Sequence, residues 1–534
     1  MFKIKSRPNF DVMADDAYTR ALDEILDVLS SGTSTDIERL KRTVCDKNRF
    51  SAFIRNSALV KRAKERGLYH LISQLRKRPM RSISGIVNIA IMTISNCPHG
   101  RCTYCPKGEG APNSYTGFEP ATMRGIQNKF DAYEQVKSRI TQLSEIGHPT
   151  DKCEVIIQGG TFLAQPREYQ ESFMLGMYNA LNGYKSDTLA QAITLNEKAP
   201  HRCIGLTIET RPDWCFQQHV DAMLSFGATR VEIGVQTLKR DVLKKTNRGH
   251  TLEDVWKATQ VAKDSFFKVC YHMMPGLYAT PDEDVGMFRE LFDNPYYRPD
   301  MLKIYPFLVM RGTEIYEEWL QGKITPYTTE EAADVIVRAY AHIPYYVRVM
   351  RVQRDIPAYL IESGVKKSNL RQLVENKLAE KRITTGEIRY REIGHNLLKG
   401  NVNYEMLEPE LIVRKYDASD GEEYFISFED KRTSILFGFV RLRVPSSPHR
   451  KEITQRSAGI RELHVYGEQL PLRHRSDASP QHRGFGKSLM AEAERISKEE
   501  LDMNKLLVIS GVGVRDYYRK LGYTLDGPYM SKML

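Results

Sequence analysis

The chain has 534 residues, too many for one compact core, so we expect two large domains joined by linking segments. With 41% hydrophobic and 27% charged residues and no low-complexity tract, the composition excludes a disordered protein. The N-terminal MFKIKSRPNF lacks an apolar run, and the longest uncharged stretch, residues 82–100, contains several polar residues, so we expect neither an export signal nor a membrane span.

The N-terminal 80 residues are expected to form a basic helical segment that binds nucleic acid. The formal net charge of +11 suits a polyanionic partner, because neutralised phosphates release counterions. One segment at helical spacing carries eight basic side chains opposed only by Glu65: Lys61, Arg62, Lys64, Arg66, Arg76, Lys77, Arg78 and Arg81. A solvated helix face would look similar, but the overall basicity favours a nucleic-acid surface.

From residue 81 to 325, short β-rich runs alternate with helical stretches. Six strands are predicted, at residues 86–95, 153–158, 203–209, 230–236, 267–274 and 301–307. Parallel strands with right-handed helical crossovers curl into a barrel, so the expected fold is α/β, a partial six-stranded parallel barrel with its chemistry at the C-terminal strand ends. Residues 326–400 are interpreted as a helical connector, and residues 401–534 as a smaller α+β domain.

The string NCPHGRCTYCPKG places Cys97, Cys102 and Cys105 on one loop directly after the first predicted strand. Three thiolates can hold three irons of a cubane iron–sulfur cluster and leave the fourth iron open. A structural zinc needs a closed tetrahedron, and no fourth cysteine lies nearby. Zinc completed by His99, or three unrelated cysteines, are the alternatives. The other five cysteines have no disulfide-framework spacing, which is typical of a reducing compartment, so a cytoplasmic protein is expected.

In the second domain, Gln481-x-x-Gly484-x-Gly486 directly precedes an amphipathic helix. A helix N-terminus with free N–H groups can cradle a pyrophosphate, and the order of strand, helix, strand and the tail VRDYYRKLGYTL resembles acetyltransferases of the GNAT type. On that resemblance, a splayed strand pairs its backbone with the pantetheine arm of acetyl-CoA. The expected contacts are Glu462, Leu463, His464 and Val465 on the strand, the amides of Phe485, Gly486 and Lys487, and the side chain of Tyr518. Because neighbours on a helix point about 100° apart, either Tyr517 or Tyr518 packs in the core, and the resemblance favours Tyr518 as the contact.

The cysteine loop resembles the radical S-adenosylmethionine (SAM) signature, with four residues in the first gap where three are common. The strings PNSYTGFEPATMRGIQNKFDAY, GGTFLAQP, TIETRPDW, HMMPGL and RVQRDIP resemble the catalytic subunit of Elongator and its single-chain archaeal and bacterial relatives over nearly the whole chain. The resemblance implies that Cys97, Cys102 and Cys105 hold a [4Fe-4S] cluster whose open iron binds SAM. It also implies the remaining site residues: Gly159 and Gly160 beside the SAM amino group, Glu209 and Arg211 lining the cavity, and Lys152 contacting acetyl-CoA.

The activity implied by this resemblance is tRNA modification. A SAM-derived radical and acetyl-CoA would form 5-carboxymethyluridine at the wobble uridine, with the anticodon stem-loop as the bound RNA and Elongator-type accessory subunits as further candidate partners. Unlike many relatives, the connector string RITTGEIRYREIGH contains no cysteine, so no zinc is expected there. Lys107 and Gly108 also stand where relatives have two glycines.

Two other functions are compatible with parts of the chain. A protein lysine acetyltransferase with a structural cluster would need a carboxylate base near the CoA sulfur, and Glu462 is the one candidate on the strand. A non-catalytic scaffold that binds tRNA would leave the cluster and SAM motifs without a role.

Overall fold

The computed structural model describes residues 16–33, 36–48, 53–76, 82, 84–400, 402–466 and 484–534. The chain divides into two compact units, residues 1–82 with 138–150 and residues 83–137 with 151–534. Within the described ranges, no helix combines the length and apolarity that crossing a membrane requires.

The first unit is helical. Its elements are α1 (Asp16–Ser30), α2 (Ile37–Lys47), α3 (Asn56–Glu65), the 3₁₀ turn η1 (Tyr69–Leu71), α4 (Ile72–Leu75) and the second half of α6 (Ala132–Glu145). An amphipathic face on α1 and apolar residues of α3 and α4 form a small core around Ile25, Leu26 and Leu59.

Part of the basic cluster is neutralised inside this unit. Arg62 pairs with Asp23 at 2.8 Å, and Arg66 pairs with both Asp23 (3.2 Å) and Asp27 (2.8 Å). The expectation that Glu65 alone opposes these charges is therefore wrong, because α1 brings two further carboxylates from about 40 residues away. Lys77, Arg78 and Arg81 lie outside the described residues.

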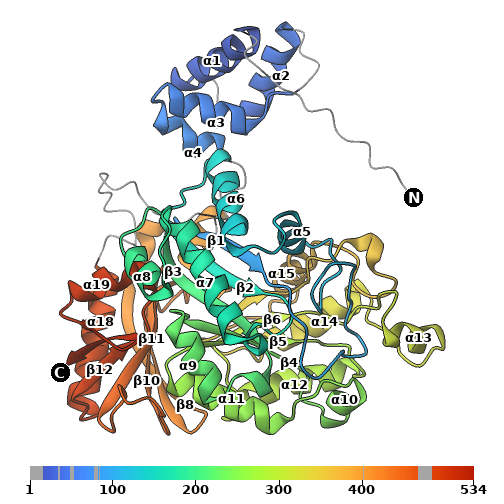
Figure 1. The fold of residues 1–534 in the computed structure, drawn as a ribbon, viewed down its shortest axis with the longest axis vertical. Coiled ribbons are helices and arrows are strands. Elements are labelled where there is room, and N and C mark those ends of the chain that lie inside the picture. Colours follow the sequence, from blue (N-terminus) through green and yellow to red (C-terminus); the bar gives the residue numbers. More distant parts are fainter. Residues whose placement is uncertain are drawn as a thin grey trace. The chain divides into compact units, whose positions relative to one another are not determined.

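In the second unit, seven parallel strands form one curved sheet in chain order (Figure 1). The strands are β1 (Val87–Met92), β2 (Lys152–Gln158), β3 (Arg202–Thr210), β4 (Arg230–Gln236), β5 (Lys268–Met273), β6 (Met301–Ile304) and β7 (Arg348–Arg351). The six predicted strands and the partial barrel are confirmed. The seventh strand, β7, comes from the connector and pairs with β6.

Helices between the strands cover the outside of the sheet (Figure 1). They are α5 (Pro120–Gln127), the first half of α6, α7 (Arg167–Asn182), α8 (Leu189–Asn196), α9 (Gln217–Ser225), α10 (Arg240–Lys245), α11 (Leu252–Asp264), α12 (Pro281–Asp293), α13 (Glu314–Leu320) and α14 (Thr329–Tyr340). Three further helices follow β7: α15 (Leu370–Glu380), α16 (Ile388–Arg391) and α17 (Ile393–Leu398). Because successive strand residues point to opposite faces, Val231, Ile233 and Val235 of β4 alternate with Arg230 and Glu232. The inner face of the barrel is therefore polar.

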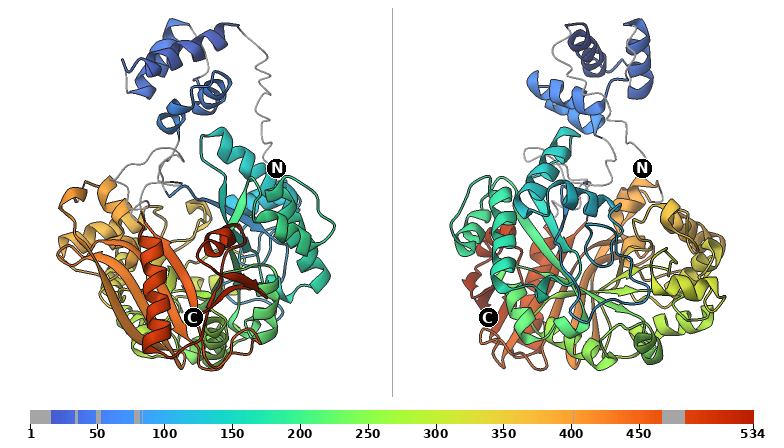
Figure 2. Two further views of the ribbon diagram at one scale, coloured as in Figure 1. Left: turned by 90° about the vertical axis from the view of Figure 1, so that its left-hand side faces the viewer. Right: turned by 45° about the vertical axis from the view of Figure 1, so that its right-hand side comes forward.

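The C-terminal part forms a second, mixed sheet of seven strands in the order β13-β14-β12-β11-β10-β9-β8 (Figure 2). Its elements are β8 (Pro409–Ala418), β9 (Gly421–Asp430), β10 (Leu436–Val444), β11 (Ser457–Val465), α18 (Phe485–Arg495), β12 (Lys505–Val508), α19 (Arg515–Arg519), β13 (Thr524–Asp526) and β14 (Tyr529–Met533). Apolar residues of α18, including Leu489 and Met490, pack on this sheet. The predicted α+β domain with a central amphipathic helix is confirmed.

The parallel pairing of β11 with β12 covers only half of β11. Residues 457–460 pair with β12, whereas residues 462–465 pair with β10 alone among the described strands. The two strands therefore separate beyond Ile460, which leaves one backbone edge of Glu462–Val465 without a strand partner.

A buried ionic network joins the second sheet to the N-terminal ends of the barrel strands. Arg461 on β11 reaches Asp300, just before β6, at 2.8 Å and Glu423 on β9 at 3.0 Å. Lys263 at the end of α11 lies 3.4 Å from Glu423, and Arg443 lies 3.0 Å from the same carboxylate. All five side chains are almost fully buried, so the charges satisfy one another rather than water.

We expect Arg461→Met to destabilise the chain by about 3–5 kcal/mol, because removing one partner leaves buried carboxylates uncompensated. Guanidinium unfolding measures this loss, and Lys431→Ala, which breaks an exposed pair with Glu410, provides a control expected to change stability by about 0–1 kcal/mol. Equal, small effects of the two substitutions would contradict a structural role for the network.

The same network predicts acid sensitivity. Burial opposes ionisation of Asp300 and Glu423, but Arg461 and Lys263 outweigh it and hold both pKa values below the ordinary range. A carboxyl group whose folded pKa is lowered stabilises the fold above its unfolded pKa, and that contribution is lost as the pH falls below about 4. Unfolding midpoints measured from pH 7 to pH 3 should therefore decline, and less steeply in Arg461→Met.

Candidate active site

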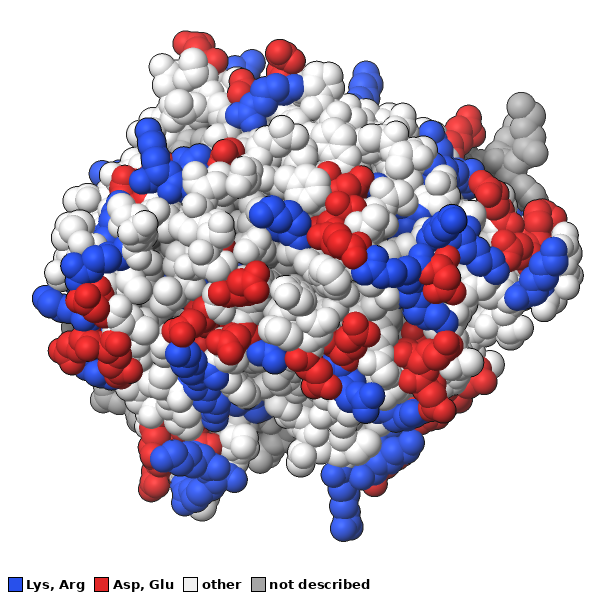
Figure 3. Space-filling view, turned by 90° about the horizontal axis from the view of Figure 1, so that it is seen from below, with Lys and Arg blue, Asp and Glu red and all other residues white. Residues whose placement is uncertain are grey.

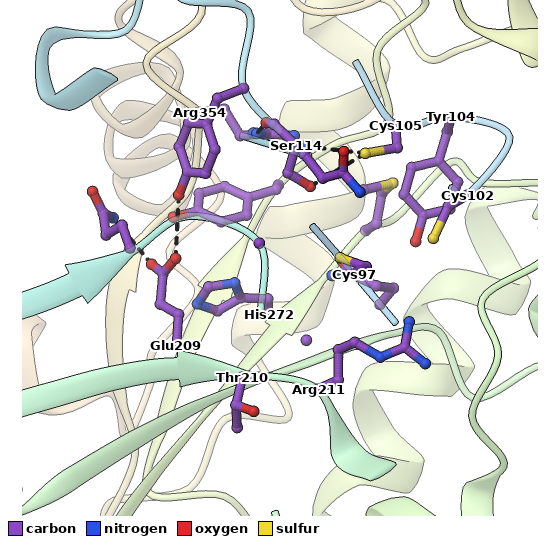
Figure 4. Close-up of a pocket in the computed structure, with 18 of the residues that line it drawn as sticks. Cys97, Cys102, Tyr104, Cys105, Ser114, Glu209, Thr210, Arg211, His272 and Arg354 are labelled. Atoms are coloured by element: carbon purple, nitrogen blue, oxygen red, sulfur yellow. Dashed lines mark hydrogen bonds between the residues drawn. The ribbon is translucent and has the colours of Figure 1, made fainter. Parts of the chain in front are cut away.

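A pocket at the C-terminal ends of the barrel strands contains the three clustered cysteines (Figure 4). Their loop follows β1 and is held by backbone hydrogen bonds from Thr103 N–H to the Thr246 carbonyl and from Ile315 N–H to the Thr103 carbonyl, both 3.1 Å. Cys102 and Cys105 are buried against apolar side chains from the ends of β5 and β6. The loop is thus fixed from both sides, with its sulfur atoms lining the pocket.

The sulfur atoms are arranged differently from the ligands of one small ion. Zn–S bonds of about 2.3 Å in a tetrahedron would bring the sulfurs within about 4 Å of one another. Among the described residues, the three cysteines do not form a group whose ligand atoms all lie within 4.8 Å. His99, the alternative fourth zinc ligand, has Nε2 3.3 Å from Cys102 Sγ and 2.8 Å from Arg211. Wide spacing suits a cluster better than zinc.

Polar groups around the loop fit an anionic cluster and a polar ligand. The Arg248 guanidinium lies 3.8 Å from Cys102 Sγ, and the Ser114 N–H donates to Cys105 Sγ at 3.1 Å. Two buried atoms here, Tyr104 Oη and Arg248 Nε, make no hydrogen bond within the described part of the chain. Because buried polar atoms are normally paired, these atoms indicate that a bound polar group belongs in the pocket.

Gly159 and Gly160 follow β2, and Gly160 lines the pocket. Both have positive φ, and a Cβ on Gly159 would stand 2.2 Å from the Thr93 carbonyl oxygen, while one on Gly160 would stand 2.4 Å from that of Ser95. Glycine is therefore required at both positions because their backbone lies against the backbone that follows β1. Their expected contact with SAM is an additional role that stays a prediction.

Glu209 and Arg211 lie at the end of β3, and both line the pocket (Figure 4). Glu209 accepts hydrogen bonds from Tyr115 Oη (3.2 Å), Gln158 Nε2 (3.0 Å) and Lys303 Nζ (3.4 Å). Arg211 is buried and paired with Asp213 at 2.8 Å, beside His99. Burial and the charge of Arg211 lower the pKa of His99 to about 4, so its imidazole is neutral at physiological pH.

An ionisable cluster continues from Glu209 into the barrel. His272 on β5 lines the pocket, and its Nε2 lies 2.8 Å from Glu232 on β4, which also pairs with Lys303 on β6. Burial opposes ionisation of Glu232, but the charges of Lys303 and His272 keep its pKa well below the ordinary range. Glu232, Cys270 and His272 bring three potential ligand atoms together, yet the Lys303 ammonium already occupies the carboxylate.

Sequence reasoning missed several residues that line the pocket: Tyr115, Arg248, His272, Tyr305, Arg351 and Arg354. It also missed Glu232, which is buried behind the pocket and pairs with His272. The sequence does contain a signal for the strand residues. Strands of a fully buried parallel sheet are usually apolar throughout, whereas RVEIGVQ and KVCYHM alternate polar and apolar residues. Arg351 and Arg354 come from the connector string RVQRDIP, which carries part of the family resemblance but has no strand or loop pattern that places it at the pocket.

Lys152 lies at the opposite end of β2 from the cluster. It begins the strand and Gln158, which lines the pocket, ends it, so the two are about 20 Å apart at the usual rise per residue. Lys152, Glu154 and Gln158 share one face of β2. Glu154 pairs with Arg230 at 2.6 Å, and the charges of Glu154 and Glu462 both act on the buried Arg230 and raise its pKa against the effect of burial. The inner face of the barrel at this end therefore lies near β11.

On β11 the expected acetyl-CoA contacts divide between two faces. Leu463 and Val465 pack towards the core around α18, whereas Glu462 pairs with Arg441 at 2.9 Å and His464 stacks on Phe439. The unpartnered backbone edge of these four residues is the feature that a pantetheine arm could use.

The loop before α18 is partly described, and Gln481 lies outside the described residues. Gly484 has φ +81° and directly precedes the helix. Phe485 and Gly486 occupy the first turn, where helix N–H groups have no intrahelical partner, whereas the Lys487 N–H donates to the Gly484 carbonyl at 2.9 Å.

The two neighbouring tyrosines have different surroundings. Tyr518 is buried in the core of the second sheet, while Tyr517 is partly buried, and a Cβ on Gly486 would stand 2.9 Å from its hydroxyl. Tyr517 therefore faces the helix N-terminus, and the role expected of Tyr518 stays a prediction.

Comparison with known proteins adds family relationships. The Radical SAM superfamily model matches residues 91–292, and the Radical_SAM C-terminal domain model matches residues 299–380. The tRNA uridine(34) acetyltransferase of Methanocaldococcus jannaschii is 46% identical over 525 residues, which cover 96% of this chain and 97% of that protein. Elongator complex protein 3 of Saccharomyces cerevisiae is 43% identical over 528 residues, covering 96% and 94%.

A solved structure has the same fold. The archaeal Elp3 of Methanocaldococcus infernus with residues 1–46 deleted superposes with a TM-score of 0.76 at 46% identity, covering 85% of this chain and 100% of that one.

The pocket predicts cluster binding that depends on its cysteines. After anaerobic reconstitution with iron and sulfide, we expect about four irons per chain and visible charge-transfer absorption, both largely lost in Cys102→Ala because a cubane needs all three thiolates. Cys45→Ala, which removes a buried thiol of the first unit, is the matched control. Full iron content in Cys102→Ala with native circular dichroism would contradict this assignment.

Proposed function

Because the chain belongs to the family of tRNA uridine(34) acetyltransferase and Elongator complex protein 3, we propose that it uses SAM and acetyl-CoA to form 5-carboxymethyluridine at the wobble uridine of tRNA. The observation that carries this proposal is that the same barrel has one candidate site at each end of its strands. A three-cysteine pocket lies at one end of the strands, and the splayed half of β11 lies near the other.

Cys97, Cys102 and Cys105 would hold the [4Fe-4S] cluster, and Gly159 and Gly160 would face bound SAM. The cluster with SAM supplies one-electron chemistry that can remove a hydrogen atom from an unactivated methyl group. The buried Arg248 offsets negative charge at the thiolates. Glu209 and Arg211 would orient bound groups, since both line the pocket and both are fixed by hydrogen bonds.

Acetyl-CoA would bind along β11 and α18. The edge of Glu462–Val465 offers backbone groups to the amides of pantetheine, and the first turn of α18 offers N–H groups to the pyrophosphate. Lys152 would contact acetyl-CoA, a role supported by its position on the same face of β2 as Glu154, whose charge acts on His464 of β11. Carbon 5 of uracil is not a nucleophile that ordinary acyl transfer could use. The acetyl group would therefore need radical chemistry, and both sites would have to open into one barrel.

The anticodon stem-loop would be bound with its wobble base unstacked, because chemistry on a base requires it to leave the helical stack. Arg351 and Arg354 at the pocket provide cations for adjacent phosphates. On the face in Figure 3, basic and acidic side chains are interspersed, so that face offers no continuous basic surface for RNA. Elongator-type accessory subunits and a cytoplasmic location belong to the same proposal.

A lysine acetyltransferase is the weaker alternative. Its required base would be Glu462, but this buried carboxylate is paired with Arg441. Burial opposes its ionisation, yet Arg441 and Lys268 lower its pKa, which makes Glu462 a weak proton acceptor.

The proposed reaction is tested with anaerobically reconstituted protein, SAM, reductant, acetyl-CoA and tRNA, followed by mass spectrometry of the nucleosides. We expect 5-carboxymethyluridine from the unsubstituted chain and none above background from Cys102→Ala, with Cys45→Ala retaining activity. Acetylation of a lysine peptide without any modified uridine would overturn the proposal.

Acetyl-CoA binding tests the assignment of the tyrosines. Tyr518→Phe should weaken binding about fivefold, as expected for one lost hydrogen bond of about 1 kcal/mol. Tyr517→Phe is the matched comparison, since it removes the hydroxyl beside Gly486. Calorimetric titration in which only Tyr517→Phe weakens binding would reassign the contact to Tyr517.

A further inference from the structure

His272 presents one free ring nitrogen to the pocket. Its Nε2 is engaged by Glu232 at 2.8 Å, and Nδ1 makes no hydrogen bond within the described part of the chain. The ring is held edge-to-face against Tyr305, with centroids 5.4 Å apart. His272 comes from β5 and Glu232 from β4, so neighbouring strands of one sheet fix the pair.

The pairing determines which nitrogen carries the proton. Glu232 is fully buried and pairs with Lys303, and it is ionised. An ionised carboxylate only accepts hydrogen bonds, so Nε2 of His272 must donate. The neutral imidazole therefore keeps its lone pair on Nδ1, the arrangement that a carboxylate–histidine pair uses for proton transfer.

The other carboxylates of the pocket are occupied by donors. Glu209 accepts from three side chains, as described above. Glu119 accepts from the backbone N–H of Thr116 at 2.8 Å and the hydroxyl of Thr122 at 3.1 Å. These donors occupy the carboxylate oxygens of Glu209 and Glu119.

The remaining candidates are also engaged. Asp355 pairs with Arg351 within one short loop. The two ring nitrogens of His99 face Arg211, and one also faces Cys102. Among the described ionisable residues of the pocket, His272 alone combines an ionised partner behind it with an unused nitrogen.

We propose that His272 is the general base for hydrolysis of the CoA thioester left on the uracil after its new carbon–carbon bond forms. This inference rests on the proposed function. In the intermediate, one methylene joins the thioester carbonyl to carbon 5 of the uracil. The carbonyl must therefore lie beside the uracil ring, in this pocket. His272 Nδ1 takes a proton from water, whose oxygen bonds to the carbonyl carbon. The carbon–sulfur bond then breaks, and the CoA thiolate leaves with that proton. The hydrolysis involves no oxidation or reduction.

Glu232 is a positioning residue in this scheme. It fixes the tautomer and stabilises the imidazolium that forms during the transfer, without touching the substrate. Lys303 compensates the charge of Glu232 when the imidazole of His272 is neutral. The three residues come from β4, β5 and β6, so the registers of these strands set the geometry.

The test follows the fate of the thioester in His272→Gln, with exposed His342→Gln as the matched control. In the full reaction, His272→Gln should still form 5′-deoxyadenosine but accumulate tRNA carrying the CoA thioester, so that the ratio of thioester-tRNA to 5′-deoxyadenosine rises. Release of free CoA thiol should slow at least about 100-fold, as expected for loss of a general base. Mass spectrometry of the RNA and a thiol assay measure the two quantities.

A second measurement needs neither cluster nor reductant. The accumulated thioester-tRNA is isolated and mixed with cluster-free chain, and hydrolysis is expected from the unsubstituted protein and not from His272→Gln. Added imidazole should restore cleavage by His272→Ala, which a purely structural histidine would not allow. Unchanged thiol release by His272→Gln, or joint loss of 5′-deoxyadenosine and thioester, would overturn the assignment. Absence of 5′-deoxyadenosine from the unsubstituted chain would instead contradict the proposed function.

Discussion

The arrangement of the second unit depends on buried charges at the base of the barrel. Arg461, Asp300 and Glu423 meet where β11 and β9 of the second sheet cross the starts of β5 and β6. A buried ionic network is stabilising only when each charge has its partners, so few docking geometries satisfy it. Because this junction is ionic, we infer that it holds β11 in one position relative to the barrel.

That constraint has a chemical consequence. The half of β11 that separates from β12 directly follows Arg461. Its Glu462 lies close enough for its charge to act on Arg230 of β4, and its His464 close enough to be affected by the charge of Glu154 on β2. The polar interior then continues through Glu232 and Lys303 to Glu209 at the cysteine pocket. A charged interior contributes less to stability than an apolar one, and such departures from good packing are typical of functional sites.

Net charge and clusters of basic residues are weak guides to RNA binding in this chain. The formal charge of +11 is spread over 534 residues. In the first unit, Asp23 and Asp27 neutralise Arg62 of α3 and Arg66, which follows that helix. Cations that lie at a pocket, such as Arg354, are fewer but better placed to contact a single unstacked nucleotide.

The sequence by itself determined the local features. Strand periodicity predicted β1 to β6, cysteine spacing predicted the cluster loop, and the glycines before α18 predicted a helix N-terminus, because each depends on neighbours within a few residues. Only the tertiary structure decided which distant groups meet. It brought the connector strand β7 and Arg354 to the barrel, opposed Arg62 with Asp23, and joined His272 to Glu232. Such pairs depend on strand register and helix packing, which the assembled sheet sets and no short segment encodes.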